Sequence, residues 1–245
     1  MVVEAPKVSK LKQSRIVSKV LIRALELWLK SQVEQVEALE LEIFGGNRQI
    51  LTGHIPSVSL AASHAIYQGL HLSQIQLQGG SIRINLSQVI KGKPLRLLEP
   101  VPVEGQLLLL ERDLQASLRS PLLSTALTDL VNTWLKCPGT SNLAQQLKDQ
   151  QISWQQIELD THRLTLKGTL TDASLQTVPV VIHAGIELAT KSLLRLTSLQ
   201  IQSHPEQPLL NLDDFELDLG SEVELDELTL TPGQLLCRGS LKVIP

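Results

Sequence analysis

The sequence has few of the residues that recognise bases and sugars or build metal sites. Its 245 residues include three tryptophans, one tyrosine and two phenylalanines, whereas proteins that stack bases on aromatic side chains need more of them. A net charge of −3 gives no overall cationic footprint for nucleic acid. The cysteines, Cys137 and Cys237, lie 100 residues apart, which excludes a disulfide framework and a cysteine-based zinc site.

Catalytic motifs are also absent from the sequence. It contains no GxSxG elbow, P-loop, GxGxxG, HExxH or EF-hand pattern. None of its six histidines lies three or four residues from another, so we expect no metal site and no cofactor. The acidic run Asp213–Glu227 could in principle bind calcium, but its acids alternate with Phe215 and Leu217, as on the outer face of amphipathic strands. We therefore expect a protein that is not an enzyme.

Charge and hydropathy bear on where the protein acts. No apolar run approaches 18 residues, and the first residues lack the features of a secretory signal, so we expect a cytoplasmic protein or one peripheral to a membrane. Residues 1–30 hold seven basic side chains against two acidic ones. Clustered cations can contact an anionic membrane, although a solvated helix face has the same pattern. The candidate membrane contacts are Lys7, Lys10, Lys12, Arg15 and Lys19.

Hydrophobic periodicity predicts an alternation of helical and strand regions. After a basic tail over 1–13, we expect one domain over 14–245, with a helix over 14–38, strands over 39–110, helices over 111–148 and strands over 152–244. The paired glycines in Gln78–Ser81 predict a hairpin turn, and Gln49–Thr52 a short strand. Ser120 is suited to cap a helix that begins at Pro121.

Two segments of the chain resemble each other. WQQIELDTHRLTLKGTL (154–170) aligns without a gap with LDELTLTPGQLLCRGSL (225–241), and Gly168 falls opposite Gly239. The spacing of apolar residues at the start of each segment leaves one extra residue before an alternating pair, which fits a β-bulge at the entry to a strand. The segment Leu72–Leu86 has the same start, so the echo predicts one bulged hairpin form that is reused in a strongly curved antiparallel sheet.

Leucine is strongly over-represented, at 50 of 245 residues, and this admits two readings. Leucine stripes at helical spacing usually reflect plain packing, which would suit a structural or partner-binding protein with a filled core. Alternatively, aliphatic surfaces can enclose acyl chains without many precise polar groups. The candidate lipid-binding residues are the two helical stripes, namely Leu21, Leu25, Trp28, Leu29, Leu123, Leu127, Leu130 and Trp134.

The block Gly46–Leu123 resembles the LmeA-like phospholipid-binding family of bacteria, formerly a domain of unknown function. The likeness extends from about Ser14 to Val243 and is most specific in Ile84-Asn85-Leu86 and Lys93-Pro94-Leu95. It implies phospholipid binding and a fold related to tubular lipid-binding (TULIP-like) proteins.

Pattern and resemblance together predict an α+β fold, in which a strongly curved antiparallel sheet wraps long amphipathic helices. We expect non-catalytic binding or transfer of phospholipid, with phospholipid and an anionic membrane surface as partners and no nucleic acid. An enzyme that acts on lipids, through Asp113 or His64, is the least favoured reading.

Overall fold

The structure is a computed structural model, and its described part is mostly antiparallel β-sheet. Strands make up 62% of these residues and helices 17%, so the expected α+β class with long amphipathic helices is wrong. The longest helix in the described part has 14 residues, as many as each of three strands. The described residues are 27, 30–31, 33–134, 151–171, 176–202, 210–211 and 214–245.

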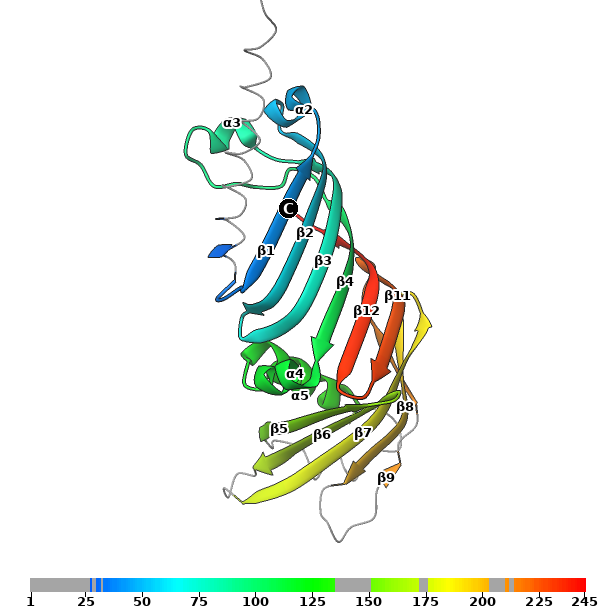
Figure 1. The fold of residues 1–245 in the computed structure, drawn as a ribbon. Helices are drawn as coiled ribbons and strands as arrows, with labels where there is room; N and C mark the ends of the chain where they lie inside the picture. The colour runs from blue at the N-terminus through cyan, green and yellow to red at the C-terminus, as the bar shows by residue number, and fades with distance from the viewer. Residues whose placement is uncertain are drawn as a thin grey trace, which may run out of the picture.

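The strands form two sheets (Figure 1). The first sheet has the order β1-β2-β3-β4-β12-β11. Its strands are β1 (Ala38–Phe44), β2 (His54–Tyr67), β3 (Leu70–Arg83), β4 (Val101–Leu110), β11 (Val223–Thr231) and β12 (Gln234–Val243). The second sheet has the order β10-β8-β7-β6-β5, and β9 also pairs with β8. Its strands are β5 (Gln151–Asp160), β6 (Arg163–Thr171), β7 (Thr177–Thr190), β8 (Leu193–Gln202), β9 (Leu210–Asn211) and β10 (Phe215–Asp218).

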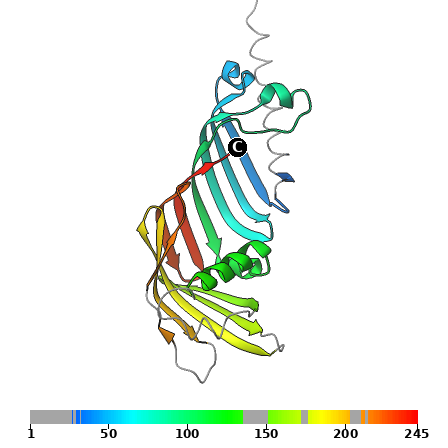
Figure 2. The same cartoon turned by 180° about the vertical axis from the view of Figure 1, so that it is seen from behind.

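The described part of the chain contains four short helices, which lie at two places along the first sheet (Figures 1 and 2). The helices α2 (Asn47–Leu51) and α3 (Leu86–Val89) lie at one end of it. At the other end, α4 (Glu111–Ser117) and α5 (Pro121–Trp134) lie between the two sheets. As expected, α5 begins at Pro121, and the Leu123 amide donates to the Ser120 hydroxyl at 3.1 Å. The stripe through Leu127 and Trp134 is therefore packed between two sheets, whereas the prediction had one sheet wrap around the helices.

The buried apolar residues form two separate clusters. The larger cluster joins α4 and α5 to both sheets and includes Leu114, Val131 and Trp154. The smaller cluster holds α2 and α3 against the first sheet through Ile50, Ile55, Ile84 and Leu86. Next to the smaller cluster, one face of the first sheet has no helix of the described part packed over it, and this face carries the candidate site.

The predicted turn at Gly79-Gly80 is wrong, because β3 runs through both glycines. The hairpin between β2 and β3 turns instead at Gln68-Gly69, where both residues have positive φ (50° and 75°), as a two-residue turn between twisted strands requires. Sequence reasoning preferred the glycine pair because glycine adopts such φ values without strain. The predicted strand Gln49–Thr52 is also wrong, since this segment forms most of α2.

The bulged hairpin is confirmed for 154–170 and 225–241, but the two copies lie in different sheets, and Leu72–Arg83 instead belongs to the continuous strand β3. The β5–β6 register shifts between Trp154 and Gln156, and Trp154 faces Gly168. The β11–β12 register shifts at the aligned place, after Leu225, which faces Gly239. A side-chain carbon at Gly168 would lie 2.7 Å from the Ser153 carbonyl oxygen. Each bulge therefore needs glycine opposite it, because the bulged backbone fills that space.

The acidic residues of 214–227 behave as the strand reading predicts. Glu216 and Asp218 on β10 are exposed, whereas Phe215 and Leu217 between them are half-buried. The same alternation continues at the start of β11. No group of three metal-ligating side chains occurs within the described ranges.

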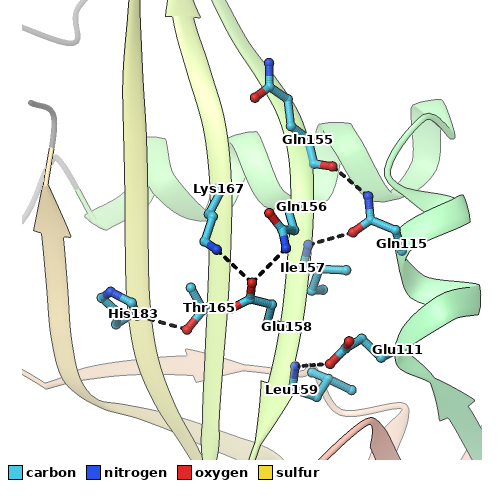
Figure 3. Close-up of polar contacts among 10 residues, drawn as sticks. All are labelled: Glu111, Gln115, Gln155, Gln156, Ile157, Glu158, Leu159, Thr165, Lys167 and His183. Carbon is cyan, nitrogen blue, oxygen red and sulfur yellow. Dashed lines mark hydrogen bonds and ion pairs between the residues drawn. The ribbon is translucent and has the colours of Figure 1, made fainter. Parts of the chain in front are cut away.

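The edge strand β5 is covered by side chains of α4 (Figure 3). The Leu159 amide donates to Glu111 Oε2 at 2.7 Å, and the Ile157 amide donates to Gln115 Oε1 at 2.9 Å. Gln115 Nε2 in turn donates to the Gln155 carbonyl at 2.6 Å. Unpaired edge groups invite pairing with another chain, so these contacts both join the sheets and protect the edge.

Replacing Gln115 by alanine is expected to lower the free energy of unfolding by about 1–3 kcal/mol, because two backbone groups of β5 lose their partner. Chemical denaturation of the variant measures this loss. Arg112→Ala, at an exposed position of the same helix, is the control and should match the wild type. Equal stability of the two variants would contradict the role given to Gln115.

The thiol of Cys237 on β12 is expected to be unreactive at neutral pH. Burial raises the pKa of Cys237 from 9.0 to about 11, so at pH 8 only about one molecule in a thousand carries the reactive thiolate. Because folding raises the pKa of Cys237, ionisation of the thiol opposes folding. The free energy of unfolding is therefore unaffected by this group below pH 9 and falls as the pH rises through 11.

A Cys137→Ser variant isolates the Cys237 thiol for measurement with a chromogenic disulfide reagent. We expect slow modification of the native protein at pH 8 and rapid modification after unfolding in denaturant. Equal rates in the two states would show that the Cys237 thiol is not protected.

Candidate functional site

An apolar groove lies on one face of the first sheet, at the end that carries α2 and α3. Its volume is about 240 Å³, and every residue of the described part of the chain that lines it is apolar. The lining comes from four neighbouring strands, the α3–β4 connection and the end of β12. The residues are Leu41, Ile55, Val58, Leu60, Leu77, Gly79, Ile82, Ile84, Leu95, Leu97, Val101, Val103 and Val243.

Strand alternation places these side chains together. Leu41 on β1 pairs with Leu60 on β2, and Leu60 pairs with Leu77 on β3. The residues next to them along each strand, such as Glu40 beside Leu41 and Gln78 beside Leu77, are exposed. Successive side chains of a strand point to opposite faces, so a row of leucines and valines forms one face of the sheet.

Gly79 creates the hollow in that face. It lies between Val58 on β2 and Val103 on β4 in the pairing register, so a side chain is missing where its neighbours carry valine. A Cβ atom there would lie 3.4 Å from Ile82 Cδ1 and 3.6 Å from Val101 Cγ1. These distances are close to ordinary contact, which means that a larger residue would fit the backbone but would fill the groove.

Asn85 fixes the connection that forms one wall of the groove. Its side chain is 7% exposed. Its Nδ2 donates to the Pro94 carbonyl at 3.0 Å, and its Oδ1 accepts the Arg96 amide at 2.8 Å. A buried amide that satisfies backbone groups in this way holds a loop in one conformation. Leu95 and Leu97 thereby line the groove.

A second, more polar cleft lies where β2 and β3 meet α4. It measures about 490 Å³ and contains both His64 and Asp113. Asp113 Oδ2 accepts the Ser73 hydroxyl at 2.5 Å, and Ser73 Oγ accepts the Leu110 amide at 2.8 Å. His64 Nδ1 lies 2.9 Å from a carboxylate oxygen of Glu37, and both side chains are largely exposed. Ser73 is buried, so these contacts fix α4 against the sheet and present no accessible nucleophile.

The structure places four of the candidate lipid-binding residues in the larger core. Leu127 and Trp134 are buried there, and Leu123 and Leu130 pack against it. The Trp134 ring meets Phe215 edge-on at 6.3 Å, and its buried N–H has no partner within the described part of the chain. None of these four residues lines the apolar groove, and their contact with lipid stays a prediction.

The other sequence candidates lie outside the described residues. These are the lipid-binding candidates Leu21, Leu25, Trp28 and Leu29, and the membrane-contact candidates Lys7, Lys10, Lys12, Arg15 and Lys19. The search for apolar stripes at helical spacing missed the groove, because strands supply most of the residues that line it. The signal was present in the alternation of Leu39, Leu41 and Ile43 and in the glycine within an apolar strand.

A comparison of the sequence with models of known protein families shows to which family this chain belongs. The family model described as LmeA-like phospholipid-binding matches residues 12–240. The chain belongs to the LmeA-like phospholipid-binding family. No curated protein and no solved structure gives a match in the corresponding searches. The stretches on which the sequence resemblance was most specific, 84–86 and 93–95, lie beside the groove, where Asn85 bonds to Pro94 and Arg96.

Among the described residues, no helix has both the length and the hydrophobicity needed to span a bilayer.

Proposed function

We propose that this LmeA-like protein binds phospholipid without catalysis, with acyl chain in the groove on the first sheet, and that it transfers lipid at a membrane surface. The observation that carries the proposal is the wholly apolar lining of the groove in a chain that belongs to a phospholipid-binding family. Ligand sites are usually apolar concavities with few polar groups, and this groove fits that description for the acyl chain of a phospholipid.

The size of the groove suits part of an acyl chain. If a methylene takes about 30 Å³, close to the share of one molecule in liquid water, a volume of about 240 Å³ holds about eight methylenes. Burying eight methylenes gains about 6 kcal/mol relative to water. The gain relative to a bilayer is near zero, because the chain is already dry there. The groove therefore favours holding and passing on a lipid over extracting it irreversibly.

The polar groups of the described residues support binding over catalysis. The buried Ser73 hydroxyl donates to the Asp113 carboxylate and accepts the Leu110 amide. Thr165 Oγ1 lies 2.9 Å from His183 Nδ1, but Thr165 is buried within β6. Burial and the nearby Arg163 lower the pKa of His183, and neither residue lines the apolar groove.

Native mass spectrometry of the purified full chain, with organic extraction of the same sample, tests the binding step. We expect co-purifying phospholipid in roughly one-to-one proportion, and exchange with phospholipid from added vesicles. Recovery of no phospholipid, together with no uptake from vesicles, would overturn the proposal and would favour a partner-binding protein with a packed core. Turnover of a labelled phospholipid would instead show an enzyme.

A further inference from the structure

The end of the molecule that carries α2 and α3 exposes large apolar side chains. We define the tip as residues 45–53 and 84–98, which include both helices. Leu51 is 56% exposed, Ile90 75% and Leu98 57%. Ile50 on α2 and Leu86 on α3 are buried in the smaller core. The tip is therefore anchored through these residues, while Leu51 on α2 and the neighbouring Ile90 and Leu98 present apolar groups to solvent at some cost in free energy.

The same surface is basic and has no acidic residue. Arg48, Lys91, Lys93 and Arg96 are all exposed, and the tip contains no aspartate or glutamate. None of these four cations forms an ion pair with a carboxylate in the described ranges. The first acid after the tip, Glu99, lies 3.5 Å from Arg83. Positive charge is thus gathered at one end of a chain whose net charge is −3.

Backbone contacts hold the tip in shape. The Gly92 amide donates to the Val89 carbonyl at 2.9 Å, and the Lys93 amide donates to the Gln88 carbonyl at 3.0 Å. Gly92 has a φ of 79°, so this turn places Lys91 and Lys93 on either side of a glycine. Together with the Asn85 bonds to Pro94 and Arg96, they make the tip a preformed surface.

We propose that the tip is a docking surface for a phospholipid bilayer that contains anionic lipid. Leu51, Ile90 and Leu98 enter the headgroup region, while the four cations contact phosphate groups. A mixture of exposed aliphatic and basic side chains without acids is complementary to such a surface. Ile84, Leu95 and Leu97 belong to the tip and also line the groove, so docking would bring the groove next to the bilayer. The inference rests on the proposed function.

Co-sedimentation of the full chain with two kinds of vesicle tests the proposal. We expect stronger binding to phosphatidylcholine mixed with phosphatidylglycerol than to phosphatidylcholine alone, and weaker binding as salt screens the charges. The double variant Lys91→Gln and Lys93→Gln should bind the anionic vesicles about thirtyfold more weakly. The matched control, Arg119→Gln with Arg163→Gln, removes two exposed cations away from the tip and should bind like the wild type.

A second variant addresses the apolar contribution. Ile90→Ser with Leu98→Ser should lose the part of vesicle binding that persists at high salt, while its circular dichroism spectrum stays unchanged. Wild-type-like binding by both tip variants, an equal loss in the control pair, or no preference for anionic vesicles would each overturn the proposal.

The two proposals fail in different ways. If tip variants lose vesicle binding but keep their co-purified phospholipid, the tip and the groove act separately and both proposals stand. If the wild type holds no phospholipid but still needs the tip to bind anionic vesicles, the groove proposal fails and the docking proposal stands. Retained phospholipid with vesicle binding independent of the tip would overturn the docking proposal alone.

Discussion

Replacing Gly79 by leucine should lower the affinity for phospholipid about a hundredfold. The four added side-chain carbons would occupy about half of the space for eight methylenes, and each lost methylene costs about 0.8 kcal/mol, so about 3 kcal/mol is lost. The backbone tolerates the change, because a Cβ at Gly79 meets only side-chain atoms at 3.4 Å or more. Lipid-to-protein ratio by native mass spectrometry and uptake of a fluorescent phospholipid measure the effect.

The neighbouring glycine provides the control. Gly80 lies on the opposite face of β3, and a Cβ there would meet no atom closer than the Pro56 carbonyl oxygen at 3.8 Å. Gly80→Leu adds the same side chain to the same strand outside the groove, and it should bind lipid like the wild type. Similar binding by both variants would show that the groove does not hold the acyl chain. Equal losses in both would point to a general effect on the sheet.

Replacing Gly239 by alanine should lower the free energy of unfolding by about 3 kcal/mol, which is at the upper end for overpacking. The added methyl group would overlap the Glu224 carbonyl oxygen and lie 2.8 Å from Leu225 Cα. Both are backbone atoms of the bulged strand, so they cannot move aside as a flexible side chain would. For a protein of this size the loss corresponds to a melting temperature about 6–12 °C lower.

Thermal unfolding followed by circular dichroism measures this loss. Gly168→Ala tests the same contact in the second sheet, where the methyl group would meet the Ser153 carbonyl oxygen at 2.7 Å. Gly80→Ala is the control, because its methyl group would meet only the Pro56 carbonyl oxygen at an ordinary contact distance of 3.8 Å. If Gly239→Ala has the same melting temperature as the control, the bulge does not require glycine, and the correspondence between the two hairpins has no structural cause.

The candidate site was only partly predictable from the sequence. The resemblance singled out Ile84-Asn85-Leu86 and Lys93-Pro94-Leu95, but their pairing depends on a side-chain bridge from Asn85 across nine residues. The stripe through Leu127 and Trp134 was correctly recognised as one apolar face. Helical spacing could not distinguish a face packed between two sheets from the wall of a cavity, because both need the same residues.

The sequence by itself determined the local features of this protein. Alternation specified amphipathic strands, the repeated spacing with Gly168 and Gly239 specified two bulged hairpins, and Ser120-Pro121 specified the start of α5. Each depends on neighbours in sequence or on one cross-strand partner. Only the tertiary structure decided that α4 and α5 cover one end of the first sheet, while no helix among the described residues packs over the groove around Gly79. An apolar pattern shows which face avoids water, but the arrangement of distant elements decides which partner covers it.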